Sequence, residues 1–374
     1  MKRSVHLLIA ATFVTVSGLA CRAILTQQTY VDFVSFWAAG RLASSSAYDI
    51  ATHRMVEMTA TDVRGLMPFA YPPPFLLILT PLGRLTYPAA FIVWVVGTGA
   101  LYTLVARRME PLSNPCVLSN ALVGQTGFLT SAVFVGGTSL LGTKPFWAGI
   151  ILGCLVIKPQ LAILIPLAFI AAGNWRAFAG AATSSLFLLG VALVAFDAGT
   201  YRAFFGVITK YPEYIQTGGW PWAKLASPYA FARYFGLNST VSLALHWSVA
   251  AAAAWVVWGA WRRAHAHKVP ILAATTLLVP PYIMTYDGLF LVVPLAALTG
   301  IPALLIWTLA LLPLLGDFGV YSGPNTISLA AGLSLVILMI DNEGQAIGHK
   351  RTPRIIKAVR LIKGLRPVAA TLGR

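Results

Sequence analysis

Acidic residues are scarce in this chain: Asp and Glu together number 11 among 374 residues. Charged residues of both signs make up only 10%, whereas an ordinary soluble domain carries about 25%. The three cysteines, Cys21, Cys116 and Cys154, are odd in number and have no metal-ligand spacing, which argues against a disulfide framework or a zinc site. The sequence also lacks a Gly-rich phosphate-binding motif. This composition excludes an ordinary soluble domain.

Apolar residues dominate what is present. They form 58% of the chain, the mean hydropathy is +0.76, and the apolar runs are long and continuous rather than alternating. Continuous runs are typical of membrane-spanning helices, and alternation is typical of barrel strands. We therefore expect an all-α, polytopic integral membrane protein with about ten to twelve transmembrane helices. One integral domain should cover residues 1–341, followed by a basic tail at 342–374.

The formal net charge is +16. The cations lie in short loops between apolar runs and in the C-terminal tail, a pattern that indicates cytoplasmic loops rather than nucleic-acid binding. Lys2 and Arg3 place the N-terminus in the cytoplasm, and we expect the signal-like first helix to remain uncleaved. In the tail, cations alternate with apolar residues, which predicts a cytoplasmic helix lying on anionic membrane lipids.

The apolar runs predict the order of elements along the chain. The expected spans are 5–25, 72–82, 88–106, 126–141, 146–172, 177–196, 240–261, 270–285 and about three more within 288–341. The run at 112–122 is weak, and 146–172 is interrupted at Lys158-Pro159-Gln160, as two short helices or one broken helix. Residues 26–71 and 197–237 are expected to be long external segments, the first with two short interfacial helices. Because the cytoplasmic loops are short, substrates should come from the membrane or the outer compartment.

Asp32 follows the first expected span and lies among the aromatic residues Tyr30, Phe33, Phe36 and Trp37. Two readings are open. Asp is a favoured N-cap residue, so it could simply start the next helix. Alternatively, aromatic surroundings raise a carboxyl pKa by desolvation unless a cation such as Arg41 opposes the effect, and the group could act as a general base on a sugar or lipid hydroxyl.

Lys158 lies between two apolar halves. It could snorkel to lipid headgroups, but an ionisable group at membrane depth is a functional candidate, and a phosphate is its natural partner. Asp287, after Tyr286, could cap a helix or belong to a site. Gln125 lies in Gly124-Gln125-Thr126-Gly127, where glycines suggest a close approach of backbone.

External cations and aromatic residues complete the candidates. For the cations, simple headgroup contact is the alternative, whereas the aromatic residues could stack on sugar faces. The cations are Arg41, His53, Lys224 and Arg233, and the aromatic residues are Trp220, Trp222 and Tyr229.

An ordered set of motifs resembles glycosyltransferase family 87. It comprises Asp32 with the stretch FWAAGRL and Tyr48, then Tyr71-Pro72-Pro73-Pro74-Phe75 with Pro81-Leu82, Gly124-Gln125-Thr126-Gly127-Phe128, Ala148-Gly149-Ile150, Lys158-Pro159-Gln160, Trp175-Arg176, Ser227 to Arg233, and Pro281-Tyr282 with Tyr286-Asp287. The resemblance covers about residues 28–300. The short segment before Gly124, with Asn114 and Asn120, departs from the pattern.

The resemblance implies a GT-C-type fold and an inverting, metal-independent transfer without a cofactor. The donor would be a polyprenyl-phosphate sugar, and the essential acid of the first external loop would be Asp32. On that basis we expect transfer of a hexosyl group, with mannosyl as the leading case, to a hydroxyl of a glycan or lipid, at the outer face of the inner membrane. The expected donor-phosphate and substrate-binding residues are Arg41, Tyr48, Tyr71, Gln125, Lys158, Gln160, Trp220, Lys224, Tyr286 and Asp287.

Two other classes of function remain open from the sequence. Proline-interrupted helices and an intramembrane lysine also suit a transporter or a flippase for a lipid-linked sugar. No repeated halves are visible, which disfavours that reading. A non-catalytic membrane scaffold is the third alternative.

Overall fold

The computed structural model describes residues 32–60, 67–214, 221–317 and 319–341. The expected first span (5–25), Trp220 and the basic tail (342–374) lie outside these residues. Within them the chain is all-α, and the one β-type contact is an isolated bridge between Leu225 and Met284.

In the described part of the chain, four helices are long and apolar enough to cross a membrane. They are α5 (Tyr87–Val105), α10 (Trp175–Tyr214), α12 (Ser239–Arg262) and α15 (Gly300–Asp317). Together with several shorter apolar helices, they identify an all-α polytopic membrane protein, as the sequence predicts. The expected second span is the helix α4 (Pro74–Gly83), whose 10 residues fall short of the ~20 that cross a bilayer unaided.

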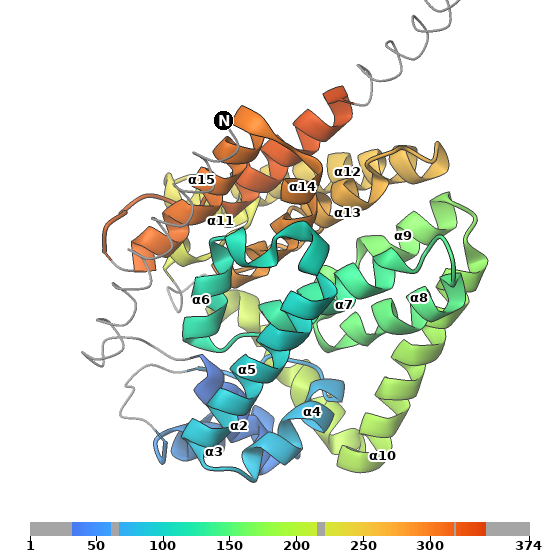
Figure 1. Ribbon diagram of the computed structural model, residues 1–374. Coiled ribbons are helices and arrows are strands. Elements are labelled where there is room, and N and C mark those ends of the chain that lie inside the picture. The colour runs from blue at the N-terminus through green and yellow to red at the C-terminus, as the bar shows by residue number, and fades with distance from the viewer. Residues whose placement is uncertain (1–31, 61–66, 215–220, 318, 342–374) are drawn as a thin grey trace, which may run out of the picture.

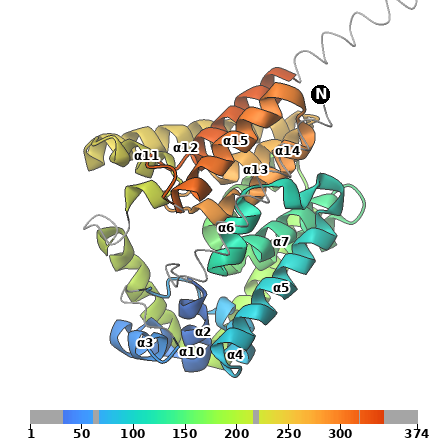
Figure 2. The ribbon, with the colours of Figure 1, turned by 60° about the vertical axis from the view of Figure 1, so that its left-hand side comes forward.

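The remaining helices are short. They are α2 (Phe33–Leu42), α3 (Ile50–Glu57), α6 (Cys116–Val123), α7 (Gly127–Ser139), α8 (Pro145–Gly153), α9 (Leu164–Ala171), α11 (Pro228–Tyr234), α13 (Lys268–Thr276) and α14 (Val292–Ala297), with the 3₁₀ helices η1 (Ser45–Tyr48), η2 (Arg107–Met109), η3 (Pro111–Ser113), η4 (Cys154–Ile157), η5 (Pro159–Leu161), η7 (Trp222–Lys224) and η8 (Thr285–Leu291). A last apolar helix covers Ile327–Asp341. In both views α2, α3 and α4 gather at one end of the molecule and α12 to α15 at the other, with α5 to α9 between them (Figures 1 and 2).

The helices α2 and α4 approach closely through two glycines. A Cβ built on Gly40 would lie 2.2 Å from the carbonyl oxygen of Leu79, and one on Gly83 would lie 2.3 Å from the carbonyl carbon of Gly40. Around this contact an aromatic cluster forms, in which Phe36 packs edge-on against Phe75 at 5.1 Å between ring centroids. This packing fixes the start of α2, where Asp32 lies.

The break expected at Lys158-Pro159-Gln160 is present. A proline disfavours the α conformation in the residue before it, and Lys158 has φ −143° and ψ 70°. The chain therefore passes from η4 to η5 through a non-helical residue. This break turns the Lys158 side chain into the interior, where it is 3% exposed.

The helix α10 changes direction at Asp197, whose φ is 63° and ψ is 171°. The boundary agrees with the end of the expected span at 196. However, the residues that follow continue as helix to Tyr214, because Asp197 Oδ1 accepts a hydrogen bond from the backbone N–H of Thr200 at 2.9 Å and starts a new helical segment. This second half of α10 packs against η1.

Candidate active site

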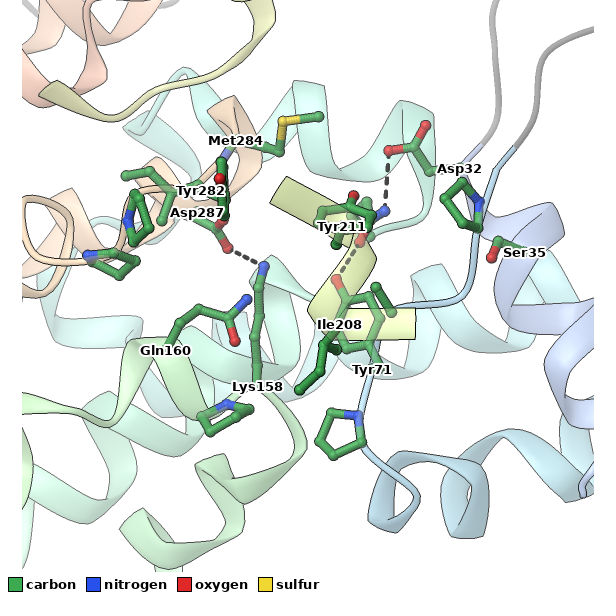
Figure 3. A pocket seen from close by; sticks show the side chains of 18 of the residues that line it. Asp32, Ser35, Tyr71, Lys158, Gln160, Ile208, Tyr211, Tyr282, Met284 and Asp287 are labelled. Atoms are coloured by element: carbon green, nitrogen blue, oxygen red, sulfur yellow. Dashed lines mark hydrogen bonds and ion pairs between the residues drawn. The ribbon is translucent and has the colours of Figure 1, made fainter. Parts of the chain in front are cut away.

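One cavity of about 460 Å³ collects most of the residues that the sequence singles out, and its volume is typical of a small-molecule site. It lies where α2, the segment before α4, the start of α7, the break at Lys158, the second half of α10 and η8 meet (Figure 3). The sequence-predicted residues that line it are Asp32, Tyr71, Gln125, Lys158, Gln160, Tyr286 and Asp287.

Asp32 occupies the N-cap position of α2, but its side chain makes no capping hydrogen bond. Its Oδ2 instead accepts a hydrogen bond from Gln125 Nε2 at 3.0 Å. Burial raises the pKa of Asp32 to about 6, while the Gln125 hydrogen bond and the charge of Lys224 oppose the rise. The capping interpretation therefore does not account for this carboxylate, which faces the cavity (Figure 3).

Gln125 joins Asp32 to Tyr71, whose hydroxyl donates to Gln125 Oε1 at 3.0 Å. Its loop is held by close backbone packing, as the glycines suggest. Gly124 has φ +67°, and a Cβ there would lie 2.7 Å from Phe33 Cβ. A Cβ on Gly127 would lie 2.5 Å from the carbonyl oxygen of Tyr286. Glycine is therefore required for the loop to carry Gln125 between these neighbours.

Lys158 and Asp287 form a buried ion pair on the opposite wall. Lys158 Nζ lies 2.5 Å from Asp287 Oδ1, and the two residues are 3% and 1% exposed. Nζ also donates to Thr126 Oγ1 at 3.4 Å and lies 4.8 Å from the centre of the Tyr286 ring. Snorkelling is excluded by this burial. Asp287 is both a site residue and a helix cap. Its Oδ2 accepts a hydrogen bond from the backbone N–H of Met284 at 3.1 Å, which caps the start of η8.

Three sequence-predicted residues lie elsewhere. Arg41 is exposed at the end of α2, with its guanidinium 5.0 Å from the centre of the Trp37 ring. Tyr48 does not line the cavity but donates its hydroxyl to the Tyr71 carbonyl at 2.8 Å, behind the cavity wall. Lys224 is also outside the wall and acts on Asp32 only through its charge.

The remaining external aromatic and basic candidates also lie outside this cavity. Trp222 packs against Tyr229 and lies under the Arg233 guanidinium, 5.1 Å from ring centre to Cζ. His53 is buried behind α2.

Sequence reasoning missed Ser35, Thr126 and Tyr211. Ser35 lies one turn after Asp32 on α2 and also lines the cavity. Its Oγ is 3.2 Å from Nε2 of the buried His53, which lies 3.5 Å from Glu57 Oε1. The signal for Ser35 was available, because residues three apart on a helix share a face. Tyr211 lines the cavity from the second half of α10, and Thr126, at the start of α7, accepts a hydrogen bond from Lys158.

The described part of the chain contains no group of three or more His, Cys, Asp or Glu side chains arranged to hold a metal ion. Chemically, the cavity offers a carboxylate of raised pKa on one wall and a buried ammonium group on the other. Such a pair suits proton transfer at one end of a substrate and anion stabilisation at the other.

Comparison with known proteins gives one match. Residues 69–281 match the model of glycosyltransferase family 87, which is more than half of the chain, and Asp32 precedes the matched range. Neither the curated proteins nor the solved structures give a match. The matched range contains Tyr71, Gln125, Lys158 and Gln160, which line the cavity. On this evidence the chain belongs to glycosyltransferase family 87 and is a membrane-embedded transferase that uses a sugar donor and an acceptor.

Proposed function

We propose that this protein moves a hexosyl group, with mannosyl as the leading case, from a polyprenyl-phosphate carrier to a hydroxyl of a glycan or lipid acceptor. The reaction would take place at the outer face of the inner membrane. The observation that carries the proposal is the single cavity in which the Asp32 carboxylate and the Lys158 ammonium occupy separate walls.

The lining of the cavity supports a lipid-linked donor. Between the polar groups its walls are apolar side chains, among them Ile163, Ile208 and Ile283, which suit a prenyl chain rather than a nucleotide. Asp287 and Thr126 accept hydrogen bonds from Lys158, and the Tyr71 and Tyr286 rings flank its ammonium group. The donor phosphate would join these partners around the buried cation.

The step itself needs one base and one stabilised leaving group. The acceptor oxygen attacks the anomeric carbon of the sugar, and the bond from that carbon to the phosphate oxygen breaks. The acceptor proton passes to Asp32, and the electron pair leaves with the polyprenyl phosphate, which Lys158 stabilises. Attack opposite the leaving group inverts the anomeric configuration.

The donor class is tested by reconstituting the full-length protein in liposomes with a lipid and glycan extract of a deletion strain as acceptor. Polyprenyl-phosphate [¹⁴C]mannose and GDP-[¹⁴C]mannose are compared, followed by the glucosyl and galactosyl polyprenyl phosphates. Labelled product should form from a polyprenyl donor. Product from the nucleotide sugar alone, or from no polyprenyl donor, would contradict the proposal.

A further inference from the structure

A second cavity, of about 410 Å³, adjoins the first. Its walls come from η1, the start of α3 and the second half of α10. Pro68 and Tyr211 line both cavities and form the partition that the two cavities share. Tyr48 lines the second cavity and donates a hydrogen bond to the carbonyl of Tyr71, a residue that lines the first. A ligand that extends past the partition would lie in both spaces.

The second cavity is lined mainly by apolar surface, as the first is, and it also carries polar groups of its own. Ser45, Asp49 and Lys210 line it together with Tyr48 and Tyr211. Asp49 Oδ1 accepts from the backbone N–H of Thr52 at 2.8 Å, which caps α3 and fixes the carboxylate. Lys210 is exposed. Within the described residues it makes no salt bridge with an acid.

These groups identify the chemistry of a ligand. A hydroxyl, a carboxylate and an ammonium offer donors and acceptors to a ligand with many hydroxyls, and tyrosine rings supply flat apolar faces for sugar rings. A prenyl chain would offer no hydrogen-bond partner to Ser45, Asp49 or Lys210, whereas the hydroxyls of a glycan would. The volume is within the range of small-molecule sites.

We infer that the second cavity is an acceptor subsite that binds the sugar units next to the one receiving the transferred hexose. The acceptor is accordingly an oligosaccharide chain rather than a single sugar. This inference rests on the proposed function and assigns a substrate class to the acceptor side of the same site.

Gly206 makes the subsite testable. It lines the second cavity, and a Cβ built on it would meet no atom within 4 Å. Gly206→Phe therefore fills the space without displacing backbone. Gly190, on the first half of the same helix, also has open space around its Cβ and does not line the cavity. Gly190→Phe is the matched control for the helical and apolar effects of the change.

The experiment measures kcat/KM for two acceptors, octyl mannoside and octyl mannotrioside, with polyprenyl-phosphate mannose as donor. For the wild type, the trioside should be the better acceptor. Gly206→Phe should lower kcat/KM for the trioside by about tenfold, which corresponds to the loss of roughly one to two hydrogen bonds. The kcat/KM for the monosaccharide acceptor should not change. Gly190→Phe should change neither. Lys210→Gln alters an exposed side chain and should lower only the trioside value.

Each outcome decides the inference. Equal losses for both acceptors, or no loss with the trioside in Gly206→Phe and Lys210→Gln, would overturn the subsite while leaving the transferase proposal standing. A wild type that prefers octyl mannoside would do the same. A wild type that consumes no polyprenyl donor with either acceptor would overturn the proposed function, and the subsite with it.

Discussion

Asp32 Oδ2 accepts a hydrogen bond from Gln125 Nε2 at 3.0 Å across a separation of 93 residues. The same Gln125 accepts from Tyr71, so one amide fixes the base candidate and one wall of the cavity together. Because the amide donates to the carboxylate, it favours the ionised form.

The pH dependence of transfer should follow from the raised pKa of Asp32. Only the ionised carboxylate can accept the proton of the acceptor, so kcat/KM should fall as the pH is lowered through about 6. Gln125, Lys224, Lys158 and Asp317 are the groups whose hydrogen bond or charge acts on it. A pH–rate profile of the wild type checks this, and a flat profile between pH 5 and 8 would contradict it.

Gln125→Leu should move that acid limb to higher pH. The substitution removes the hydrogen bond that lowers the pKa of Asp32 while burial, which raises it, remains. The rate at high pH should change less than the rate at pH 6. The control is Gln160→Leu, because Gln160 also lines the cavity but is not among the groups that act on the pKa of Asp32. A profile that drops uniformly without shifting would argue that Gln125 acts only in folding.

Replacing Lys158 should separate stability from donor binding. Lys158→Met leaves Asp287 buried without its cation and should lower the free energy of unfolding by about 3–5 kcal/mol. The double variant Lys158→Met/Asp287→Leu removes both charges and should recover much of that stability, because a buried pair can be replaced by apolar groups. Transfer activity should recover in neither variant.

The measurements are thermal unfolding in detergent and transfer from polyprenyl-phosphate mannose. If the double variant regains activity along with stability, Lys158 has a structural role and does not hold the donor phosphate.

Gly127→Ala should destabilise the loop that carries Gln125. The added Cβ would lie 2.5 Å from the Tyr286 carbonyl oxygen and 2.6 Å from Asn120 Oδ1. Overpacking of this kind costs about 1–3 kcal/mol. Gly97→Ala on α5, where the Cβ would meet no atom within 4 Å, is the control and should be neutral or stabilising. Equal melting temperatures for the two variants would contradict the packing argument.

Local sequence signals predicted several features well. Hydropathy predicted the all-α membrane architecture, and Pro159 predicted the break that turns Lys158 inward, because both depend on neighbouring residues alone. The motifs also singled out Asp32, Gln125, Lys158 and Asp287. The structure places all four around one cavity. The pairing of Lys158 with Asp287, 129 residues away, was not predicted, since it depends on how η8 packs on the break. The second half of α10 was expected only as part of an external segment, because its helical start depends on the Asp197 cap.

The central claim is tested most directly by the rate of transfer in Asp32→Asn at saturating polyprenyl-phosphate mannose. Asparagine keeps the size of the side chain and an oxygen that can accept from Gln125, but it loses the negative charge and the capacity to take a proton. We expect the rate to fall by about 10²–10⁴-fold with the donor still bound and the fold intact. A variant that transfers mannose at close to the wild-type rate would contradict the assignment of Asp32 as the base.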